Sequence, residues 1–327
     1  MKLLSLLKSI KRHNPTMTLE EVAELTQMKT LEDCKRYMKV MLDFYFDVIQ
    51  STASRKASST LEDDRNIWLQ QMFCMGNHFI SLLDGVGYQR KDIRLNPIID
   101  PDVLFTVARR IYESVVSFNL LFIQPVDANH QSILYNLFMA HGLSERLKDL
   151  DEDMRNRYPC RVLEEAAAIA ACKKAITCNP LYATLNKQTQ NTIDNAFGKK
   201  YRYFFNENDE LKFVQFEDAY ICLKIREDMF AQQYSFFSLH GHPSYLSIIQ
   251  FRDAFKKEFL ADTMMAKHAT QCALTFLSIF IVDYMKSNAD VKAMYDNLEL
   301  PRRFAIGMYE DAMRGEHISS NNSSVSR

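Results

Sequence analysis

The stretch Val103–Ile123, VLFTVARRIYESVVSFNLLFI, decides the fold class. Apolar residues recur in it every three or four positions, which is the spacing of one helical face. These residues are Leu104, Val107, Ile111, Val115, Phe118 and Phe122. From Ile111 onward the opposite face is apolar as well, and a helix that is apolar all round lies inside a protein. The stretch therefore predicts a central buried helix around which other helices pack.

One carboxylate interrupts this apolar helix. Glu113 is the only charged residue between Ile111 and Ile123, and a carboxylate in a core must be paired, hydrogen-bonded or protonated. Arg109 precedes it by four residues, so the two side chains share a face of the helix. Two interpretations stay open: the pair binds or activates a ligand inside the bundle, or it is a buried ion pair that fixes the packing of the helix.

The composition supports an all-α, multi-helix bundle. The chain has 327 residues, of which 47% are hydrophobic and 25% charged, as in ordinary soluble globular proteins. Only 8 Gly and 8 Pro occur, which argues against many-turned sandwiches, barrels and glycine-rich phosphate loops. The net charge of −1 provides no electric field that would attract nucleic acid.

Composition shifts predict the organisation of the chain. We expect a helical extension over residues 1–50 and a linker over 51–60, because STASRKASST is small and polar. The main helical bundle then covers 61–316, and the polar segment HISSNNSSVSR at 317–327 is expected to be disordered.

Periodicity and turn residues predict the individual elements. Asp100 is expected to cap the central helix, with Pro101 in its first turn. The residues before them, 86–100, are expected to form a loop, and 201–216 a short β-hairpin. Further helices are expected over residues 18–26, 31–50, 61–84, 127–150, 161–178, 181–197, 217–239, 244–259, 261–286, 290–297 and 302–314, with a charged connection, DEDMRNR, at 151–157.

The seven cysteines are scattered and form no Cys-x-x-Cys motif. They are expected to be reduced and mostly buried thiols, which is typical of a cytoplasmic protein, here of bacterial type. The N-terminal segment lacks a small-residue cleavage site, and the apolar run Cys272–Val282 is too short to span a bilayer. We therefore expect no association with a membrane.

A second polar segment, YSFFSLHGHP, runs from Tyr234 to Pro243. Its glycine and proline are expected to end a helix there and to present His240 and His242 at a turn. These imidazoles could bind a metal, act as general acid and base, or cap the helix end. No third ligand is close in sequence, so we expect no metal site. The candidate catalytic residues are Arg109, Glu113, Tyr234, Ser238, His240 and His242.

These motifs carry a resemblance. Arg-x-x-x-Glu in a central apolar helix, followed far downstream by Tyr-x-x-x-Ser and a histidine, resembles a bacterial all-helical domain family of unknown function. That family is associated with the HEPN (higher eukaryotes and prokaryotes nucleotide-binding) superfamily and with abortive-infection proteins. The likeness covers about Leu61–Lys286, and the family's histidine, three residues after the serine, corresponds to either His240 or His242. The resemblance implies an all-helical fold and a setting in phage defence.

HEPN ribonucleases typically carry Arg, four to six further residues, and then His. None of the 8 histidines has an arginine at that spacing. The chain also lacks Glu-x-x-His, His-Glu-x-x-His, Gly-x-Ser-x-Gly and the glycine-rich nucleotide motifs, so we expect no cofactor.

Three functional hypotheses follow. The first is a binding or regulatory module with a protein partner or a small ligand. The alternative is a HEPN-like ribonuclease or another hydrolase that uses Glu113 with His240 or His242, and only this hypothesis implies RNA as a partner. The third is a structural bundle, and assembly into a homo-oligomer stays open under each.

Overall fold

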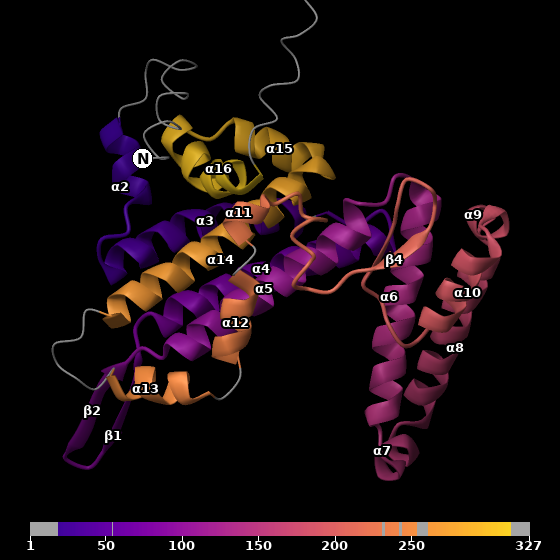
Figure 1. Ribbon diagram of the computed structural model, residues 1–327, viewed down its shortest axis with the longest axis horizontal. Coiled ribbons are helices and arrows are strands. Elements are labelled where there is room, and N and C mark those ends of the chain that lie inside the picture. Colours follow the sequence, from indigo (N-terminus) through magenta and orange to yellow (C-terminus); the bar gives the residue numbers. More distant parts are fainter. Residues whose placement is uncertain (1–18, 54, 231–232, 242–243, 254–260, 315–327) are drawn as a thin grey trace, which may run out of the picture. The chain divides into compact units, whose positions relative to one another are not determined.

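A computed structural model describes residues 19–53, 55–230, 233–241, 244–253 and 261–314 (Figure 1). In these ranges the protein is built of helices, and its strands form two small antiparallel hairpins. This confirms the predicted all-α, multi-helix class with a short hairpin at 201–216. The expected disordered tail, 317–327, lies outside the described residues.

The chain forms two compact units. Unit 1 combines residues 1–115 with 224–327, and unit 2 is the intervening segment 116–223. This division differs from the expected extension, linker and main bundle, because helix α3 (Leu31–Ala53) starts in the expected extension and continues into the expected linker. The fully buried side chains of α3 belong to the core of unit 1 rather than to an appendage.

Unit 1 is a helical bundle with one hairpin. Its core pairs α14 with α3 and α16, and α3 with α4. In chain order its elements are α2 (Leu19–Thr26), α3, α4 (Thr60–Leu82), β1 (Val86–Arg90), β2 (Ile93–Ile98), the first part of α5 (Pro101–Phe122), α11 (Glu227–Phe230), α12 (Gln233–Gly241), α13 (Tyr245–Asp253), α14 (Ala261–Lys286), α15 (Ala289–Asp296) and α16 (Leu300–Arg314).

Helix α5 has the predicted start and the predicted burial. Asp100 caps it, because its carboxylate accepts a hydrogen bond from the backbone N–H of Asp102 at 2.9 Å. From Ile111 to Phe122 each residue except Glu113 is buried. The all-round apolar pattern therefore predicted a buried helix correctly.

Unit 2 contains the last part of α5 and a pair of packed helices, α6 and α8. A small hairpin joins Tyr203 to Phe213 and Phe205 to Leu211. The elements of unit 2 after α5 are α6 (Ala128–Asp149), α7 (Glu152–Arg157), α8 (Pro159–Thr177), α9 (Pro180–Thr184), α10 (Lys187–Ala196), β3 (Tyr203–Phe205) and β4 (Leu211–Phe213).

His130 ties the start of α6 to the turn of this hairpin. Its Nδ1 lies 2.8 Å from Oδ1 of Asp127, and its Nε2 lies 3.0 Å from Oδ1 of Asp209. The ring meets Phe205 edge-on at 4.9 Å. Burial alone would lower the pKa of His130, but the two carboxylates outweigh it and hold this pKa above its usual value. We therefore treat His130 as a structural cation.

Four local predictions were wrong. Residues 86–98 form the hairpin β1–β2 instead of a loop, and DEDMRNR forms helix α7 instead of a connection. Residues 181–197 divide into α9 and α10. The long helix expected over 217–239 is absent, because the chain makes turns up to Lys224, whose φ of 57° is left-handed and cannot continue a helix. Only the short α11 and then α12 follow.

Helix α14 contains the most apolar long segment. Among the described residues, one helical segment, Met264–Lys286, is both long enough and apolar enough to cross a bilayer. Of its most apolar part, 72% is buried inside the protein. Such burial is typical of the core helix of a bundle. Three of its residues, Phe276, Phe280 and Tyr284, are among the largest fully buried side chains.

Candidate functional site

The sequence-predicted residues come from α5 and α12, both in unit 1 at these positions. Those with described positions are Arg109, Glu113, Tyr234, Ser238 and His240. The sixth, His242, lies outside the described residues. The structure divides the hydrogen bonds of these residues between two groups, one around Arg109 and one around His240.

Arg109 forms the centre of the first group. Its Nε donates to Oε1 of Glu113 at 2.8 Å, and its Nη2 donates to the phenol oxygen of Tyr234 at 3.0 Å. The guanidinium also lies 5.2 Å from the centroid of the Tyr234 ring, within the range of a cation–π contact. Burial would lower the pKa of Arg109, but Glu113 and Tyr234 raise it overall. Arg109 therefore links α5 to α12 as a fixed cation.

The carboxylate of Glu113 is paired and only partly buried. The side chains of Arg109 and Glu113 are 24% and 18% exposed, so neither is sealed inside the core. The end of α12 lies close to the same guanidinium, since a Cβ added to Gly241 would come within 3.1 Å of Nη1 of Arg109. A side chain at this last residue of α12 would press against the ion pair.

His240 forms the second group, and its partner is Asp102, which the sequence reading did not single out. The Nδ1 atom of His240 lies 2.6 Å from Oδ1 of Asp102 across 138 positions of sequence. With Asp102 accepting from Nδ1–H, Nε2 is the basic nitrogen of the ring. The His240 side chain is 1% exposed, and its Nε2 has no hydrogen-bond partner among the described residues. The nitrogen that could act as a base thus has no path to solvent.

Aromatic rings surround this imidazole. Phe105 stacks on it at 4.7 Å and Phe236 lies at 4.5 Å. His268 of α14 contacts the same two phenylalanines, and burial lowers the pKa of His268. In the sequence, the partners of His240 on α5 were indicated only by Asp102 in the first turn of this helix and by Phe105 one turn later.

Among the described residues neither ring nitrogen of His240 bonds to Glu113, because Nδ1 faces Asp102 and Nε2 has no partner there. Ser238 is half-buried on α12, two residues before His240. Glu113 and His240 therefore do not form one hydrogen-bonded pair within the described residues. Chemically, the first group holds a fixed ion pair and the second a carboxylate-oriented imidazole inside an aromatic pocket.

Metal ligands do not cluster in the described residues, where no group of three or more His, Cys, Asp or Glu side chains could hold an ion. The cysteines are all free. Cys34, Cys172, Cys222 and Cys272 are buried, as expected, whereas Cys74, Cys160 and Cys178 are exposed. Burial raises the pKa of Cys222 to about 11 and that of Cys272 to about 12, so these thiols are unreactive.

A feature that the sequence reading missed is an apolar surface on the hairpin β1–β2. Tyr88 pairs with Leu95, and Arg90 with Ile93, so these four side chains share one face. Tyr88, Ile93 and Leu95 are 65%, 72% and 52% exposed. We call these three residues the apolar face. Alternation of apolar and polar residues over 86–95 was the signal that could have revealed it.

A pocket opens at the base of this hairpin. It has a volume of about 280 Å³. Its lining residues are Leu82, Val86, Ile98, Asp100, Val103 and Phe251. Phe251 comes from α13, so the pocket lies where that helix meets the two strands, the end of α4 and the start of α5. Apolar walls with one carboxylate suit an apolar side chain better than a charged ligand.

Comparison with models of protein families, with curated proteins and with solved structures gave no match. The geometry of the chain itself therefore carries the functional argument.

Proposed function

We propose that this protein is a binding module, with a regulatory role and with another protein as its partner. The observation that supports this most directly is the apolar face of the hairpin β1–β2. An isolated two-stranded hairpin is marginally stable in water, and exposed contiguous apolar surface on a soluble protein is typical of an interaction site. The setting in phage defence is part of the proposal and rests only on the resemblance to abortive-infection proteins.

The chemistry of the surface describes the partner. The pocket of about 280 Å³ accepts one apolar anchor side chain. Arg90, Lys91 and Arg94 are exposed on the same hairpin, with Asp92 as the acidic residue between them. A partner segment with acidic residues beside an aliphatic or aromatic anchor complements both features.

The test compares two double variants of the full chain. Tyr88→Ser/Leu95→Ser removes apolar surface from the hairpin, whereas Val126→Ser/Leu163→Ser removes comparably exposed side chains from unit 2, where Val126 and Leu163 are 82% and 70% exposed. We expect both variants to keep the melting temperature of the wild type. Proteins captured by the wild type and by the unit 2 variant, but lost with the hairpin variant, are then purified and titrated against both.

We expect the purified partner to bind the hairpin variant with an affinity about tenfold or more below that for the wild type. Its affinity for the unit 2 variant should equal that for the wild type. Equal binding by both variants would contradict the proposal. Sedimentation of the wild type tests whether the protein assembles into a homo-oligomer. If the hairpin variant converts a dimer to a monomer, the surface binds a second copy instead of another protein.

A second candidate function, hydrolysis of RNA or another substrate, is favoured by one observation, the orientation of His240 by Asp102. A histidine with its Nδ1 held by a carboxylate and its Nε2 unbonded has the form of a general base. Because that nitrogen is buried, catalysis would require α12 to move away from α5. The test is toxicity on overexpression that disappears in His240→Ala/His242→Ala with the melting temperature unchanged. Toxicity that persists in this variant excludes the function.

A further inference from the structure

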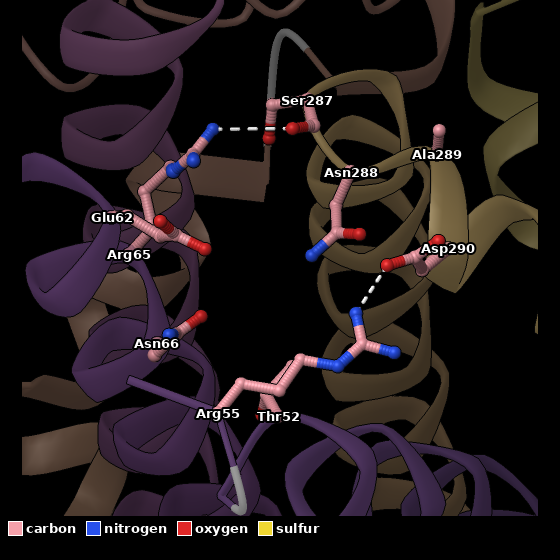
Figure 2. Close-up of a pocket in the computed structure, with 9 residues that line it drawn as sticks. All are labelled: Thr52, Arg55, Glu62, Arg65, Asn66, Ser287, Asn288, Ala289 and Asp290. Atoms are coloured by element: carbon pink, nitrogen blue, oxygen red, sulfur yellow. Dashed lines mark hydrogen bonds and ion pairs between the residues drawn. The ribbon is translucent and has the colours of Figure 1, made fainter. Parts of the chain in front are cut away.

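A second pocket in unit 1 is polar, and Figure 2 shows its lining. Its volume is about 220 Å³. The lining residues are Thr52, Arg55, Glu62, Arg65, Asn66, Ser287, Asn288, Ala289 and Asp290. They come from the end of α3, the segment after it, the first turns of α4 and the junction of α14 with α15. None of them belongs to the groups around Arg109 and His240 or to the apolar face.

The charges of this pocket are unequally satisfied. Glu62 receives hydrogen bonds from the backbone N–H of Ser58 at 2.7 Å and from the Ser58 hydroxyl, which lower the pKa of Glu62. Asp290 is paired with Arg55. Each carboxylate therefore already has a donor.

Arg65 is the exception. Its one hydrogen bond within the described residues runs from Nη1 to the backbone carbonyl of Ser287 at 3.2 Å, and it forms no ion pair with a described carboxylate. The residue is half-buried on α4. A guanidinium has five N–H donors in a planar fork, so most of those of Arg65 are available at the pocket. Glu62 of the same pocket attracts this cation without forming an ion pair with it, so an anion that accepts from the guanidinium would use donors that are still available.

One neighbouring amide, that of Asn66, adds a donor. The Oδ1 atom of Asn66 accepts from the Tyr284 hydroxyl at 2.7 Å, so its NH₂ group is what remains. The Oδ1 atom of Asn288 caps α15 by accepting from the N–H of Val291 at 3.3 Å, and its NH₂ group bonds to the Tyr284 hydroxyl. The first-turn N–H groups of α15 lie at the same wall, where the helix dipole favours negative charge.

We propose that this pocket binds the oxyanion group of a small molecule, with Arg65 as its principal ligand. Carboxylate and phosphate share the planar or tetrahedral acceptor oxygens that a guanidinium binds in a bidentate manner. The pocket has room for the anionic end of a small polar molecule and excludes a folded partner. Arg55 supports the anion indirectly, because it neutralises Asp290 at the entrance.

The experiment titrates the full chain with inorganic phosphate and with acetate by calorimetry, at an ionic strength held constant with chloride. Arg65→Gln removes the principal ligand. Arg303→Gln is the matched control, because Nη1 of Arg303 also donates to a backbone carbonyl, that of Asp296 at 3.1 Å, but at the opposite end of α15. Whichever probe binds more tightly identifies the ligand as a phosphate or a carboxylate.

We expect saturable binding of at least one probe, a loss of about tenfold or more in affinity in Arg65→Gln, and no change beyond about twofold in Arg303→Gln. Absence of binding by both probes in the wild type overturns the proposal, as does undiminished binding in Arg65→Gln. If Arg65→Gln does not fold, Arg55→Gln replaces it. This variant leaves Asp290 unneutralised and should weaken binding several-fold, and unchanged affinity in it overturns the proposal.

Discussion

At the scale of single residues, ionised side chains connect distant parts of each unit. Arg109 bonds to Glu113 one turn away on its own helix and to Tyr234 on α12, 125 positions later. Glu113 neutralises the guanidinium and Tyr234 fixes its orientation, without a ligand. This favours a structural role for the pair, so variants of Glu113 are poor tests of function, because lost stability and lost binding would be confused.

His130 gives a prediction with a definite sign. Its pKa in the folded protein is raised, so its contribution to stability is fully present below its unfolded pKa of about 6.5 and is lost as the pH rises through the folded value. We expect His130→Asn to cost about 1 kcal/mol at pH 5.5, and less at pH 8.5. Urea denaturation followed by circular dichroism at both pH values measures the difference.

His141, on the same helix, is the control of opposite sign. Burial lowers the pKa of His141, so its contribution is present at higher pH and is lost as the pH falls. The cost of His141→Asn should therefore not decrease from pH 5.5 to pH 8.5. A cost of His130→Asn that is constant or grows with pH would contradict the assignment of His130 as a cation.

At the scale of helices and strands, close packing of helices places demands that residue type alone does not show. Gly76 of α4 is buried against α3, and a Cβ added there would lie 2.6 Å from Cδ2 of Leu42. Gly142 of α6 has no atom within 4 Å of the same added carbon. Both residues are interior to helices, where replacement of Gly by Ala removes an entropic cost.

Replacement of these two glycines by alanine should therefore change the stability of the protein in opposite directions. Gly142→Ala should stabilise the protein by about 0.5–1 kcal/mol through helix propensity. Gly76→Ala should destabilise it by about 1 kcal/mol or more, because overpacking of a core outweighs that gain. Leu42→Val, which removes the obstructing methyl group, should cost less in the Gly76→Ala background than in the wild type. The denaturation midpoints of these four variants test the prediction. Equal stabilisation by Gly76→Ala and Gly142→Ala would disprove the close contact between Gly76 and Leu42.

At the scale of the whole molecule, unit 1 is assembled from both ends of the chain. The hydroxyl of Tyr37 donates to the carbonyl of Ala305 at 2.7 Å, which joins α3 to α16. At the far end of α16, Arg314 binds both carboxylate oxygens of Asp283 at 2.7 Å each. Burial would raise the pKa of Asp283, but Arg314 and Lys286 outweigh it and hold this pKa below its usual value. The buried carboxylate is therefore charged and depends on its partners.

Loss of Arg314 should destabilise unit 1. Arg314→Met leaves Asp283 buried with Lys286, whose Nζ is 2.7 Å away, and should cost about 2–3 kcal/mol near pH 7. Asp283→Leu/Arg314→Met removes both charges and should recover most of this loss. The cost of the single variant should shrink as the pH falls and Asp283 is protonated. A double variant as unstable as Arg314→Met would show that packing, and not charge, explains the loss.

The amino-acid sequence by itself determined the class of the protein and most of its helices. Apolar periodicity placed α14 at 261–286 and buried α5 on all sides, because a helix must hide such a surface wherever it packs. The pairing of Arg109 with Glu113 also followed from local geometry, since residues four apart on a helix are neighbours.

Only the tertiary structure decided how distant segments combine. It joined residues 1–115 with 224–327 in one unit, paired His240 with Asp102 instead of Glu113, and gave Arg65 a single hydrogen bond among the described residues. It also showed that 86–98 is a hairpin whose first strand is exposed along its length. Contacts between residues far apart in sequence depend on packing of whole elements, and no local pattern encodes them.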